Sequence, residues 1–147
     1  DYLKALKPNV QTYTQSGTAP SGALGVGETP IAIQFTPGFL KLADEGYPVQ
    51  VVFPSEGVGY EVASVSILKG AQHPDDAKKL VDWITSKEGQ EALSATKTYF
   101  LPIRGDVSGG KGVPSLDKIK LVEADPKFAA ENKQRLVDRW TKEVLGQ

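Results

Sequence analysis

Short apolar runs bounded by proline and glycine alternate with helix-length segments in the first half of the chain. This rhythm constrains the fold more than any other feature. We expect strands at residues 10–14, 31–35, 49–53 and 60–68, because each run is apolar or alternates apolar and polar side chains. Connections of helix length favour parallel strands covered by helices. The sequence therefore predicts an α/β fold.

Proline at the first turn and apolar residues at helical spacing mark the helices. The clearest helix begins at Pro74, where Asp75 and Asp76 complement the positive helix end. The last one has Asp125 as its N-cap and Pro126 at its first position. In all, we expect helices at residues 2–7, 20–27, 37–46, 74–84, 85–95 and 126–144.

Composition excludes several classes of function. The chain has 147 residues, of which 17 are basic, 18 are acidic, one is His and none is Cys. That length suits one ordinary domain. The balanced charge argues against nucleic acid, because binding to the phosphate backbone depends on an excess of basic residues. No apolar run is long enough for a membrane span, and the absence of Cys removes thiolate zinc sites and thiol nucleophiles.

The sequence contains no catalytic constellation. His73 precedes Pro74 at a helix start, where we expect an exposed capping role. No HExxH zinc motif and no GxSxG nucleophile motif accompanies it. The glycines between Gly17 and Gly27 match neither the dinucleotide pattern nor the P-loop pattern. We therefore expect no catalytic residue, no metal site and no cofactor, and we interpret the protein as a non-enzyme.

A polar turn is the first candidate binding site. Ser16, Gly17 and Thr18 lie between an expected strand and an expected helix start. Unpaired N–H groups and the helix dipole at such a turn attract a carboxylate or phosphate, and the two hydroxyls add donors. Ser16 or Thr18 can equally serve as a cap of that helix, so the spacing leaves both interpretations open.

The segment at residues 54–61 is the second candidate. It holds two carboxylates, Glu56 and Glu61, together with Tyr60 and the flexible Gly57. These residues suit a polar binding edge, because glycine lets a ligand approach the backbone. A hinge or an exposed turn explains the same composition.

Several short motifs follow one another in a set order between about residue 10 and about residue 105. They are SGTAP at 16–20, GYPV at 46–49, PSEG at 54–57, ILKGA at 67–71, DWI at 82–84 and SKEGQ at 86–90. In this order and spacing the chain resembles the bacterial extracytoplasmic solute-binding proteins of ABC importers. The branch that looks most similar contains the ferric-iron, phosphonate and sugar-phosphate binders.

The resemblance implies a type II periplasmic-binding-protein fold. Its two lobes are three-layer α/β/α structures with mixed, mainly parallel sheets, joined by crossing hinge strands. It also implies that this chain is the C-terminal half and that the N-terminal half is absent. Residues 1–55 would belong to the second lobe and 56–100 to the first, while 101–147 would return to the second lobe and end in its C-terminal helix.

The resemblance assigns the turn at Ser16 to an anion-binding role. The stretch around Thr36 lies where ferric binders carry adjacent tyrosines, but Phe35 offers no phenolate oxygen, which favours an anionic or phosphorylated organic solute over iron. Glu56 lies where related binders carry an acidic residue. The ligand-binding residues implied in this way are Ser16, Gly17, Thr18, Thr36, Glu56, Gly57 and Tyr60.

The function implied is the capture of a small solute between two lobes for an ABC importer, outside the cytoplasm and either lipid-anchored or free in the periplasm. The partners implied are the solute, the membrane permease, and either the missing N-terminal half or a strand-exchanged second copy. A ferric-iron-binding protein of the same family and an α/β phosphate-handling enzyme are the alternatives. A fragment with no activity of its own is a further one.

Overall fold

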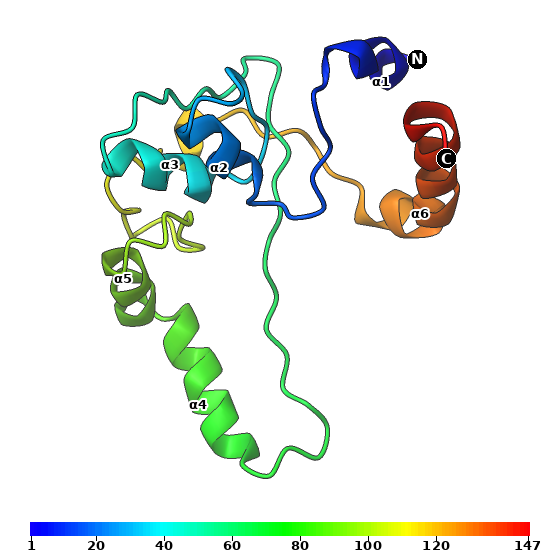
Figure 1. The fold of residues 1–147 in the computed structure, drawn as a ribbon. Coiled ribbons are helices and arrows are strands. Elements are labelled where there is room, and N and C mark those ends of the chain that lie inside the picture. Colours follow the sequence, from blue (N-terminus) through cyan, green and yellow to red (C-terminus); the bar gives the residue numbers. More distant parts are fainter. The chain divides into compact units, whose positions relative to one another are not determined.

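The computed structural model describes residues 1–147 and consists of helices joined by irregular segments. All six expected helices are present, with ends that lie within a few residues of the predicted ones. They are α1 (Tyr2–Leu6), η1 (Lys7–Asn9), α2 (Pro20–Gly25), α3 (Thr36–Asp44), α4 (Pro74–Thr85), α5 (Lys87–Ala95), η2 (Leu116–Lys118), α6 (Pro126–Trp140) and η3 (Thr141–Leu145). Figure 1 shows their order along the chain.

The expected α/β fold is wrong for this structure. The chain is 46% helical with only 1% strand, and it forms no sheet, so neither the three-layer lobes nor the parallel strands are present. The one pairing is an isolated parallel bridge between Val58 and Leu121. A run with strand-like composition forms a strand only when a second segment pairs with its backbone. None of the four expected runs forms a strand, and those at residues 31–35, 49–53 and 60–68 show no such pairing.

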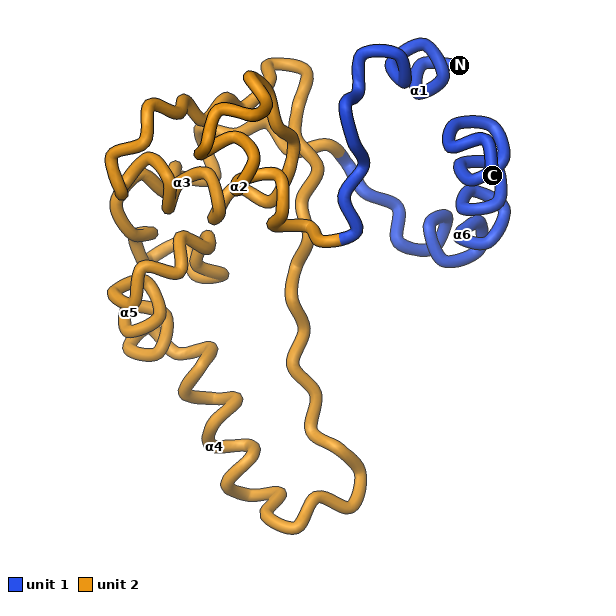
Figure 2. Tube along the Cα trace, viewed as in Figure 1, with its two compact units in different colours: residues 1–15, 123–147 blue, residues 16–122 orange.

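The chain divides into two compact units, drawn in different colours in Figure 2. The first comprises residues 1–15 and 123–147. Its helix α6 begins as predicted, since Asp125 accepts a hydrogen bond from the Phe128 amide at 2.9 Å. Trp140 meets Tyr13 edge to face with the ring centroids 4.9 Å apart. The ring contact joins the two ends of the chain within this unit.

The second unit comprises residues 16–122 and holds α2 to α5. Helix α4 ends and α5 begins at Ser86, whose hydroxyl oxygen accepts from the Gly89 amide at 3.1 Å. Helix α3 carries the buried Leu40 and stops before Gly46, which has φ +88°. Only glycine takes that backbone conformation without a steric cost, so the helix ends there.

The segment between Gly59 and Ile67 makes no backbone hydrogen bond and forms the long green coil that leads to α4 in Figure 1. Val62 and Leu68 are largely exposed. Much apolar surface is therefore left uncovered. No helix has both the length and the hydrophobicity that crossing a membrane requires.

Candidate functional site

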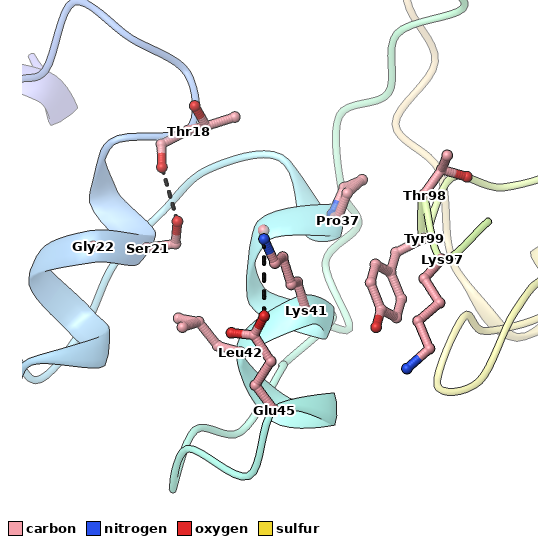
Figure 3. A pocket seen from close by; sticks show the side chains of 11 residues that line it. Thr18, Ser21, Gly22, Pro37, Lys41, Leu42, Glu45, Lys97, Thr98 and Tyr99 are labelled. Atoms are coloured by element: carbon pink, nitrogen blue, oxygen red, sulfur yellow. Dashed lines mark hydrogen bonds and ion pairs between the residues drawn. The ribbon is translucent and has the colours of Figure 1, made fainter.

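A hollow of about 430 Å³ lies in the second unit, between helices α2 and α3 and the short segment 97–99 (Figure 3). Hydroxyl, ammonium and carboxylate groups lie in its lining beside a somewhat larger apolar surface. The lining residues are Thr18, Ser21, Gly22, Pro37, Gly38, Lys41, Leu42, Glu45, Lys97, Thr98 and Tyr99.

The turn before α2 forms one wall of the hollow. The Ser16 hydroxyl lies 3.2 Å from that of Thr18 and accepts from the Thr18 amide at 3.3 Å. Ser21 donates its hydroxyl to the Thr18 carbonyl at 2.8 Å, and its amide donates to the Gln34 side chain at 2.7 Å. One amide of the first helical turn is thus satisfied by Gln34, so the turn acts partly as a structural cap and partly as a polar wall.

Gly17 holds this turn close to an aromatic ring. A Cβ atom at that position would lie 2.7 Å from the Cε2 atom of Phe35. Any larger residue would push the turn away from the ring. The close packing of this turn against Phe35 therefore favours glycine at position 17, in addition to the approach of a ligand that the sequence suggested.

Helix α3 supplies the charged floor. Lys41 and Glu45 are four residues apart, and their Nζ and Oε1 atoms lie 3.8 Å apart across the helix surface. In Figure 3 both side chains lie between the Thr18 and Ser21 wall and the Tyr99 and Lys97 wall. Because the pair is mostly exposed, it is weak, and the Lys41 ammonium is available to another anion.

Asp44 organises the third wall, although it does not line the hollow itself. Its Oδ2 atom accepts from Lys97 at 3.0 Å and from the Tyr99 hydroxyl at 2.8 Å, while Oδ1 accepts from Lys111 at 2.8 Å. The hydrogen bonds from Lys111, Tyr99 and Lys97 hold the pKa of Asp44 far below its usual range. The same bond raises the pKa of the Tyr99 hydroxyl, which donates to the carboxylate. Asp44 is thus a carboxylate with three donors.

The backbone of this wall is strained. Lys97 and Tyr99 both have φ +58°, in the left-handed region that non-glycine residues rarely occupy. Tyr99 is buried, and its hydroxyl and the Lys97 ammonium converge on one oxygen of Asp44. The bonds to Asp44 help to hold both residues in this conformation.

The structure separates the residues that the sequence grouped into one site. Thr18 lines the hollow, and Ser16 and Gly17 precede it in the same turn. Thr36 and Gly57 instead line a second, mainly apolar hollow of about 1080 Å³. Glu56 and Tyr60 are exposed and line neither.

The sequence reading missed Lys41, Lys97 and Tyr99. Lys41 and Glu45 look like an ordinary surface pair at helical spacing. Lys97 meets Asp44 across 53 positions, so no local pattern signals that contact. Nor does any group of three or more His, Cys, Asp or Glu side chains come together to hold a metal ion.

Comparison with known proteins agrees with the motif order. The family described as bacterial extracellular solute-binding protein matches residues 1–130. An uncharacterized protein of Haemophilus influenzae is 40% identical over 148 residues, covering 98% of this chain and 42% of the relative. The chain thus spans less than half the length of that relative. No solved structure matches this chain. The chain belongs to the family of bacterial extracellular solute-binding proteins.

Proposed function

We propose that this chain is the C-terminal part of a longer polypeptide that serves as the solute-binding component of an ABC import system. Family membership supports a binding role, and the 42% coverage of the Haemophilus influenzae relative supports a longer parent protein. The parent binds its solute outside the cytoplasm, performs no chemistry on it, and delivers it to a membrane permease.

The solute is a small anionic organic molecule, phosphorylated in the favoured case. The observation that carries this proposal is the clustering of Lys41 and Lys97 with the Thr18 hydroxyl around one hollow. The Ser21 hydroxyl in the same lining donates its proton to the Thr18 carbonyl. With Glu45, the charged groups of the lining sum to one positive charge. Ammonium and hydroxyl donors together suit a phosphate or carboxylate.

The remaining predicted residues contribute a second contact surface. Thr36, Glu56, Gly57 and Tyr60 contact the organic part of the solute, while the turn at residues 16–18 holds its anionic end. Residues 56–100 then move as one lobe against the rest of the chain. Such closure requires that the solute bind the closed form better than the open one.

The extended, exposed segments need a cover. We assign that role to the N-terminal part of the parent protein, with a strand-exchanged second copy as the alternative. Exposed Val62 and Val65, on a segment without backbone hydrogen bonds, support the need for such a partner.

The test is isothermal titration calorimetry on the full-length polypeptide with pairs of solutes that differ by one phosphate group. We expect micromolar binding of a phosphorylated member and at least tenfold weaker binding of its neutral counterpart. Ser16→Ala and Glu56→Ala should each weaken binding by about 1 to 3 kcal/mol, the loss expected for a desolvated hydrogen bond.

Ser108→Ala is the matched control, because Ser108 is exposed and lines neither hollow. It should leave the affinity unchanged. A broad panel without any anionic binder, or binding of ferric iron alone, would contradict the proposal.

A further inference from the structure

Lys97 occupies two roles at once in this structure. Its side chain lines the hollow, yet its ammonium lies 3.0 Å from Asp44 Oδ2. In Figure 3 that ammonium points away from the hydroxyls of Thr18 and Ser21. The side chain is 74% exposed, so it has room to change rotamer.

Asp44 does not depend on Lys97 for compensation. If the Lys97 ammonium left, the carboxylate would keep Lys111 at 2.8 Å and the Tyr99 hydroxyl at 2.8 Å. The carboxylate is only 11% exposed, so these two donors matter more than water does. One cation and one hydroxyl still satisfy a single negative charge. Releasing Lys97 is therefore inexpensive.

We propose that Lys97 is the cation that determines the specificity of the hollow, exchanging Asp44 for the anionic group of the solute, and that Asp44 is its positioning residue. This inference rests on the proposed function, and it names the solute class more closely. Lys97 lines the hollow while its ammonium pairs with Asp44 at 3.0 Å, so the side chain lies at the boundary between its two partners.

The exchange favours solutes whose anionic group carries more negative charge than the carboxylate of Asp44. A solute carboxylate carries the same charge as Asp44, so swapping one for the other is close to neutral. A phosphomonoester carries nearly two negative charges at neutral pH and attracts the same ammonium almost twice as strongly. Lys41, on the floor of the hollow, adds to that attraction. The hollow therefore selects phosphomonoesters over monocarboxylates.

The experiment uses phenyl phosphate and benzoate as probes, because they share one ring and differ in the charge of the anionic group. Dissociation constants are measured on the full-length polypeptide at pH 7.5 by calorimetry. Lys97→Gln should weaken phenyl phosphate binding about tenfold, the loss expected for one charge-assisted hydrogen bond. Lys79→Gln is the control, because Lys79 also pairs with an aspartate at 3.0 Å but lines neither hollow.

The variant Asp44→Asn tests whether Asp44 competes with the solute for Lys97 or only stabilises the fold around the hollow. Without the competing charge, Lys97 no longer has to leave a carboxylate, so the binding of phenyl phosphate and of benzoate should each strengthen about fivefold. A purely structural role of Asp44 would instead weaken the binding of both probes. Lys111→Gln is the second variant: it leaves Asp44 more dependent on Lys97 and should weaken phenyl phosphate binding two- to fivefold, without changing a residue that lines the hollow.

The outcomes separate this inference from the proposed function. If the wild-type protein binds phenyl phosphate but Lys97→Gln binds it equally well, or if Asp44→Asn binds both probes no more tightly than the wild type, the exchange is refuted and the solute-binding role stands. If the wild-type protein binds neither these probes nor any other anion, both proposals fail.

Discussion

Gln90 offers a direct test of how the second unit is held together. It is a buried polar residue of α5, 7% exposed. Its Nε2 atom donates to the Ile84 carbonyl at 2.7 Å, and its Oε1 atom accepts from the Ile103 amide at 3.0 Å. One side chain thus ties the end of α4 to the segment that follows α5.

Gln90→Met keeps the length of the side chain and removes both hydrogen bonds. The Ile84 carbonyl and the Ile103 amide would each lose a partner at a part-buried site. Each such loss costs about 1 to 3 kcal/mol, and the apolar methionine recovers part of it. We expect a net loss of about 2 to 4 kcal/mol in local opening free energy.

Amide hydrogen exchange of the full-length polypeptide measures this loss locally. Since about 1.4 kcal/mol corresponds to a factor of ten, exchange at α5 and Ile103 should accelerate about 30- to 700-fold. Glu91→Ala is the control, because the Glu91 side chain is exposed and lies 3.8 Å from Lys87; exchange there should change less than about threefold. Exchange within twofold of wild type in Gln90→Met would refute the bridging role.

Two further predictions follow from backbone geometry and charge. Gly46 has φ +88°, which an alanine adopts only with strain, so Gly46→Ala should lower the free energy of unfolding by about 1 kcal/mol. Gly22 lies inside α2 with open space around a Cβ, so Gly22→Ala should raise the free energy of unfolding by about 0.5 to 1 kcal/mol. Urea titration of the full-length polypeptide compares the two variants. Hydrogen bonds from Arg139 and Lys4 lower the pKa of Glu143 to about 2 from 4.5. This contact therefore stabilises the first unit above about pH 4.5, and the stabilisation is lost as the pH falls to about 2. An NMR titration of the Glu143 carboxyl group measures the pKa directly. Equal effects of the two alanine substitutions would refute the first prediction. A Glu143 pKa near 4.5 would refute the second.

The helices could be predicted because their signals are local. Asp125 caps α6 and Pro126 opens it, and the hydrogen bonds that they organise lie within a few residues. Pro74 and the following aspartates also begin α4 at the predicted position, although its N-cap His73 makes no side-chain capping hydrogen bond. Motif order likewise indicated the family, since it needs no knowledge of contacts.

The strands could not be predicted by the same reasoning. Residues 49–53 and 60–68 have apolar, alternating composition, but a strand exists only when another segment pairs with its backbone. Composition states which faces are apolar, whereas pairing depends on what lies beside them. The one bridge, between Val58 and Leu121, joins positions that no local pattern connects.

The candidate site likewise has a part that local sequence signals predict and a part that depends on contacts between distant residues. The sequence by itself determined the helix ends, the family and the polar turn that contains Thr18, because these depend on neighbouring residues or on motif order. Only the tertiary structure decided that Lys41 and Lys97 face the same hollow as that turn, and that Asp44 holds Lys97 across 53 positions. The physical reason is range: capping and turn formation act over a few residues, whereas an ion pair between distant segments exists only after the chain has brought them together.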